Sequence, residues 1–209
     1  MNIIVYILWL PFVFSLIVFS LAVLAYYGQR SLRRLIAATL LFYISLAALK
    51  TWLQFQVWSQ TELGKVLLNS PLDQNTPGIF GQLGFLTAAP GGYFFFYALS
   101  RFWFSVLATV LVALLFYSLL KLLEKNWPHL FEASEPELGL LTALLVGWPL
   151  FALFLPLTLG LTVVFSLTAS LFWKKNRVTI GQPMLLAAAL SLLLGDFLSQ
   201  FIPLALLKI

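Results

Sequence analysis

The sequence predicts an all-α integral membrane protein, a polytopic bundle of about six membrane-spanning helices forming one domain over residues 1–209. Of the 209 residues, 62% are hydrophobic and only 9% are charged, whereas soluble domains typically carry about 25% charged residues. The mean hydropathy is +1.00. This composition leaves too little polar side-chain surface to cover a fold in water, so the lipid bilayer is the expected main partner.

The basic residues predict topology and not nucleic-acid binding. The net charge of +5 comes largely from two short clusters, Arg30–Arg34 and Lys174–Arg177. Short basic clusters beside apolar runs determine membrane orientation, and the chain lacks the extended basic face that nucleic acids require. There is no cysteine, which excludes disulfides, thiolate metal sites and thiol catalysis.

Two apolar runs open the chain, and each is long enough to span a bilayer core, which takes roughly 20 residues. The first, 3–27, is expected to be retained, because it has no basic n-region and exceeds the roughly 7–15 apolar residues of a cleaved signal peptide. The second covers 35–58. Its last third, from Lys50, mixes aromatic and polar residues in the manner of a headgroup-level segment.

Residues 59–92 predict an interfacial or re-entrant segment. The stretch contains Pro71, Pro77, Pro90 and six glycines, so a continuous span is excluded. Its two apolar pieces, around 66–68 and 79–89, are too short to cross the membrane.

The distribution of charged residues indicates how the second half of the chain is divided into membrane spans. After a span over 93–120, residues 138–173 form a run of 36 residues without a charge, and one helix of that length would extend roughly 54 Å. If both basic clusters are cytoplasmic, this run must leave and return, as two passes or a deep hairpin. Breaks at Pro149, Pro156 or Gly160 then predict spans over 138–155 and 157–173.

A last span over 183–207 brings the predicted total to six membrane spans and places both termini outside, on the side opposite the cytoplasm. The segregation of charge favours a bacterial cytoplasmic membrane as the location.

Three charged residues, Lys50, Arg101 and Asp196, lie within or beside apolar runs. Intramembrane charges are functional candidates. Each is 16 to 20 residues of helix from a basic residue on the inner side, which is roughly 24–30 Å and places all three near the outer boundary. Two interpretations stay open: the side chains snorkel or pair to stabilise the bundle, or Asp196 and a basic partner form an ionic site for transport.

The loop before residue 138 has the densest group of titratable residues. His129, Glu132 and Glu135 are weak candidates for a metal site, but their spacing does not put three ligands on one helical face. Ser134, Glu135 and Pro136 fit a helix start better, with Ser134 as the N-cap and acids in the first turn. The sequence contains no nucleotide-binding or hydrolase motif, and no cofactor is expected.

From Glu135 to Asp196 the sequence resembles the C-terminal part of type IV prepilin peptidases, which are membrane aspartyl proteases. Glu135 begins an apolar run that ends in Gly147-Trp148-Pro149, a basic loop follows at 174–177, and a run from Gly181 ends in Gly195-Asp196. The resemblance covers about 60 residues and implies a helical membrane fold.

The sequence departs from that family at its catalytic positions. Glu135 stands where the family has its motif aspartate, the motif glycines and the cysteine cluster are absent, and Asp73 is the only faint match to the second catalytic aspartate. The predicted topology puts Asp73 outside and Glu135 inside, where they cannot share a proton. Two interpretations remain: a degenerate relative without protease activity, or a generic likeness between membrane sequences.

The sequence therefore leaves three classes of function open. The first is a non-catalytic scaffold or assembly component that contacts other membrane proteins, because no complete catalytic set can be assembled. The second is a small-solute transporter or pore subunit centred on Asp196. The third is a carboxylate-based intramembrane peptidase using Glu135 with Asp73 or another acid.

Overall fold

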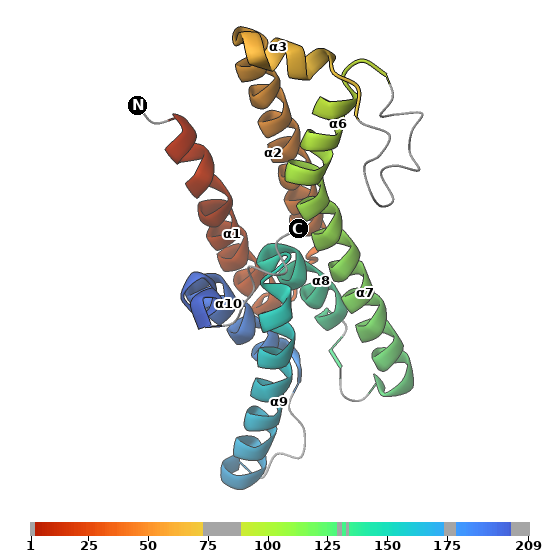
Figure 1. The fold of residues 1–209 in the computed structure, drawn as a ribbon. Coiled ribbons are helices and arrows are strands. Elements are labelled where there is room, and N and C mark those ends of the chain that lie inside the picture. Colours follow the sequence, from red (N-terminus) through yellow and green to blue (C-terminus); the bar gives the residue numbers. More distant parts are fainter. Residues whose placement is uncertain (1–2, 73–88, 129–130, 133, 174–178, 202–209) are drawn as a thin grey trace. The chain divides into compact units, whose positions relative to one another are not determined.

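The structure, a computed structural model, describes residues 3–72, 89–128, 131–132, 134–173 and 179–201 (Figure 1). Within these ranges the chain is helical and has no strand, which confirms the predicted all-α class. The helices are α1 (Ile3–Tyr27), α2 (Arg33–Gln60), α3 (Glu62–Asn69), α6 (Gly92–Ala98), the π-helix η1 (Leu99–Trp103), α7 (Phe104–Asn126), α8 (Glu135–Val146), α9 (Phe151–Trp173) and α10 (Gly181–Phe201).

Four described stretches of helix are long and apolar enough to cross a membrane. They are Trp9–Tyr27, Arg33–Gln60, Gly92–Asn126 and Phe151–Phe172, and they correspond to predicted spans 3–27, 35–58, 93–120 and 157–173. Helix α8 has only 12 residues, and the apolar stretch Gly181–Gly195 of α10 is also shorter than a full span.

The break in the run 138–173 falls at Pro149, one of the three predicted positions, and therefore earlier than the boundary between the predicted spans 138–155 and 157–173. The structure places the break at residues 147–150, and α9 continues through Pro156 without interruption. Gly147 ends α8 with φ of +67°, and the Trp148 backbone N–H then donates to Thr109 Oγ1 at 2.9 Å. A proline only frees one helix carbonyl, which membrane helices tolerate, whereas a backbone at positive φ cannot continue the helix.

The described residues form two compact units, one from the described parts of 1–41 and 108–208 and the other from the described parts of 42–107. In the first unit, α8 packs against α1, α9 and α10 (Figure 1). Ten of its 12 residues are buried. An isolated helix of this length is marginal in water, so the neighbouring helices hold α8 in its helical form.

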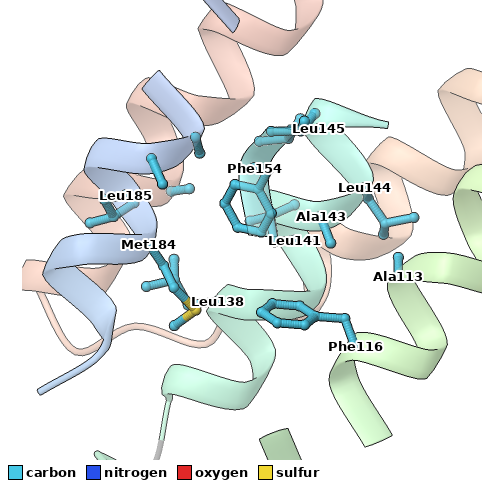
Figure 2. Close-up of a cluster of buried hydrophobic side chains, with 14 of the residues drawn as sticks. Ala113, Phe116, Leu138, Leu141, Ala143, Leu144, Leu145, Phe154, Met184 and Leu185 are labelled. Atoms are coloured by element: carbon cyan, nitrogen blue, oxygen red, sulfur yellow. The ribbon is translucent and has the colours of Figure 1, made fainter. Parts of the chain in front are cut away.

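The core of the first unit surrounds α8 (Figure 2). Leu138, Leu141 and Leu144 of α8 are at most 1% exposed. Phe116 of α7 and Phe154 of α9 meet edge to face, with ring centroids 5.8 Å apart. Gly139 lets α8 approach closely, because a Cβ at that position would collide with Leu120 Cδ1.

The second unit is joined by aromatic side chains. The Trp58 ring of α2 lies 5.3 Å from the Phe94 ring and 5.0 Å from the Tyr97 ring, measured between centroids. The Trp103 Nε1–H group donates to Thr51 Oγ1 at 3.1 Å. Of the predicted segment 59–92, residues 62–69 form the short helix α3, and residues 73–88 lie outside the described residues.

The helix break at Gly147 can be tested by comparing alanine substitutions at Gly147 and at Gly160. Gly147→Ala forces a non-glycine residue into a sparsely populated backbone region and is expected to lower the free energy of unfolding by about 1–3 kcal/mol. Gly160→Ala, in the exposed interior of α9 with no atom within 4 Å of the new Cβ, is expected to be neutral or to stabilise by up to about 1 kcal/mol. Thermal unfolding of both variants in detergent measures the difference, and equal effects would contradict this account of the break.

A buried carboxylate at the start of helix α8

Glu135, the first residue of α8, is 0% exposed. Its Oε1 accepts a hydrogen bond from the Gly181 backbone N–H at 2.5 Å, and its Oε2 accepts one from the Glu132 backbone N–H at 3.0 Å. A buried carboxylate without such donors would cost several kcal/mol. These two bonds therefore connect the carboxylate to the loop before α8 and to the first residue of α10.

Tyr26, at the end of α1, closes the cluster from a third side. Its hydroxyl donates to Glu132 Oε2 at 3.3 Å. Gly181 lies between this tyrosine and Glu135: a Cβ there would collide with the Tyr26 hydroxyl and come within 2.9 Å of Glu135 Oε1. The close approach thus requires glycine at position 181.

Burial raises the pKa of Glu135 above its ordinary value, because it removes water from the charged form. The backbone N–H groups of Glu132 and Gly181 oppose the shift, and the nearby Glu132 carboxylate adds to it. The net direction is upward. The folded protein therefore holds the Glu135 proton more tightly than an exposed glutamate does.

The predicted start of α8 is confirmed, with Ser134 at the N-cap position and Glu135 and Glu137 in the first turn. Ser134 occupies the N-cap position without a side-chain hydrogen bond to the helix. The Glu135 carboxylate turns back to the Glu132 N–H, outside the helix.

An ion pair connects the same end of α8 to the start of α2. Arg33 Nε lies 3.0 Å from Glu137 Oε1. Because both side chains keep contact with solvent, the pair contributes little to stability and mainly orients the Arg33 side chain.

The other candidate residues are not brought into this cluster by any described contact. Asp73 and His129 lie outside the described residues, as does the side chain of Asp196 in α10. Lys50 of α2 is half-buried and Arg101 of η1 is exposed, and neither forms an ion pair with a described carboxylate. The described part of the chain contains no group of three or more His, Asp or Glu residues placed to hold a metal ion.

The sequence pointed to Glu132 and Glu135 but gave no sign of Tyr26 and Gly181. Tyr26 is 106 residues from Glu132, and Gly181 is 46 residues from Glu135. Nothing local to either position signals a partner so distant. Only the packing of α1 and α10 on α8 brings them together.

The fold and this cluster define a class: a helical chain with several helices suited to a membrane, in which a buried carboxylate bonds the loop before α8 and the start of α10. No protein-family model, curated protein or solved structure matches the chain.

Glu135→Gln is expected to destabilise the protein by about 1–3 kcal/mol. Glutamine has one acceptor oxygen for two backbone donors, and its NH2 group must face the other N–H. The matched control is Glu62→Gln, which removes an acid from the exposed pair with Lys65 and is expected to cost no more than about 1 kcal/mol. Unfolding in detergent measures both, and an unaffected Glu135→Gln variant would refute the structural role.

The raised pKa of Glu135 also makes the stability of the folded protein depend on pH. Between the ordinary glutamate pKa and the higher folded value, the folded state holds a proton that the unfolded state has lost. The contribution of Glu135 to stability therefore falls as pH rises through this window. The stability of the wild type minus that of Glu135→Gln, measured against pH, is expected to decline there and then level off; a rise would contradict the assigned direction.

Proposed function

We propose that the chain is a non-catalytic integral membrane component, a scaffold or assembly partner for other membrane proteins. The observation that supports this is the burial and hydrogen bonding of Glu135, the acid that stands where prepilin peptidases have their motif aspartate. Both carboxylate oxygens accept backbone hydrogen bonds, and the side chain is 0% exposed. A general acid or base must reach its substrate directly or through one water, and this carboxylate has no free approach.

The proposed topology keeps both basic clusters on the cytoplasmic side and both termini outside. The contacts around Glu135 support it, because they bring the end of α1, the start of α8 and the start of α10 together. Residues 30–34 and 174–177 adjoin these points in the sequence. Helix α8, about 18 Å long at 12 residues, then serves as the short arm of a deep hairpin with α9.

Cysteine labelling tests this topology, and the natural absence of cysteine removes any background. Arg34→Cys and Lys175→Cys are expected to react with an impermeant maleimide from the same side of sealed vesicles, the cytoplasmic one. Lys65→Cys, in α3, is the reference for the opposite side. Labelling of positions 34 and 175 from opposite sides would overturn the arrangement.

A second candidate, a carboxylate-based intramembrane peptidase, is favoured by one observation. Glu132 places another carboxylate, bonded to the Tyr26 hydroxyl, beside the buried Glu135. A pair of neighbouring carboxyls is the arrangement that carboxylate-based acid–base catalysis uses. The transport alternative depends on Asp196, whose side chain lies outside the described residues.

A survey of protein N-termini in membranes separates the first two candidates. Membranes with wild-type protein, with Glu132→Gln, or with neither are expected to show the same set of N-termini. Glu132 is exposed, so its variant is expected to fold, and equal protein amounts are confirmed by immunoblot. An N-terminus that forms only with the wild type would establish hydrolysis and refute the non-catalytic proposal.

A further inference from the structure

A cavity of about 880 Å³ lies beside the turn between α1 and α2. One part of its wall is apolar and includes Leu21, Leu24 and Leu35. The other part is basic and includes Arg30, Arg33 and Arg34. All of these residues belong to the first unit, so the cavity is formed within one compact body.

The turn that shapes this cavity is closed by backbone hydrogen bonds. The Gly28 N–H donates to the Leu24 carbonyl at 3.0 Å, and the Arg30 N–H donates to the Ala25 carbonyl at 2.8 Å. Gln29 adopts a φ of +52°, which reverses the chain. The basic residues are thereby held next to the last two turns of α1, where Leu24 is 70% exposed.

The positive charge at the cavity is only partly neutralised. Arg33 pairs with Glu137, while Arg30 and Arg34 are exposed and form no ion pair with any described carboxylate. The cavity therefore presents two uncompensated guanidinium groups and one oriented by its partner. Guanidinium forks match the geometry of phosphate oxygens.

We infer that this cavity binds an anionic phospholipid of the surrounding leaflet, with the phosphate against the arginines and the first acyl carbons along Leu21 and Leu24. The inference rests on the membrane location proposed above. A free phosphate would use only the basic wall and leave the adjoining leucines uncovered, whereas a phospholipid covers both. Basic pockets between membrane helices on the cytoplasmic side are suited to anionic headgroups.

Lipid binding to the purified full chain tests the inference. Native mass spectrometry in neutral detergent is expected to show tighter binding of phosphatidylglycerol than of phosphatidylcholine with the same chains. Arg30→Gln/Arg34→Gln is expected to weaken phosphatidylglycerol binding about 25-fold, at about fivefold per arginine, and to weaken phosphatidylcholine binding less, because the choline cation offsets the phosphate charge. Lys65→Gln/Lys125→Gln, which removes the same charge outside the cavity, is expected to bind as the wild type does.

Two further arms identify the source of the phosphate. Millimolar glycerol 3-phosphate or inorganic phosphate is expected to leave phosphatidylglycerol bound. Leu24→Ser is expected to weaken the binding of both phosphatidylglycerol and phosphatidylcholine. Displacement by either soluble anion would replace the lipid site with a simple anion site. Equal binding of the two lipids by the wild type, or equal losses in the two double variants, would overturn the inference.

The proposed membrane location fails separately, through recovery of the chain as a soluble protein without detergent. A chain that needs detergent but does not select phosphatidylglycerol would refute only the lipid site.

Discussion

A carboxylate that is removed from water must find hydrogen-bond donors within the protein, and the first unit is arranged around this requirement of Glu135. Its two oxygens take donors from the loop before α8 and from the first residue of α10, and Tyr26 brings the end of α1 to the same point through Glu132. Two neighbouring carboxylates, those of Glu135 and Glu132, thus connect three segments that are far apart in the sequence. The absence of a side chain at Gly181 allows the approach.

The same constraint accounts for the short helix α8. Its first residue is held by the carboxylate bonds, and its last is followed by the turn at Gly147, where Thr109 of α7 accepts the Trp148 N–H. Between these points, the close approach at Gly139 and the leucines shown in Figure 2 bring α7, α9 and α10 onto α8. Polar contacts fix the two ends of α8, and apolar packing stabilises the length between them.

The buried acid and the exposed arginines are far apart in the sequence and serve different roles. Glu135 is satisfied inside the protein, which supports a structural part for it. Arg30 and Arg34 have no described acidic partner, so their charge is directed outward, beside exposed leucines of α1. Arg33 links the two regions, since its pair with Glu137 joins the start of α2 to the first turn of α8.

Composition and local pattern determined the helical class, four of the apolar helices and the start of α8 at Glu135, because these depend on hydrophobicity and on residues close in sequence. The site of the break near Gly147 was not decided locally, since the run offered several breakers of similar strength and the Thr109 bond comes from 39 residues away. Likewise, the sequence marked Glu135 as an acid opening an apolar run but left its partners unidentified. Only the tertiary structure decided that Tyr26 and Gly181 surround it, because their proximity results from helix packing and has no signal in the local sequence.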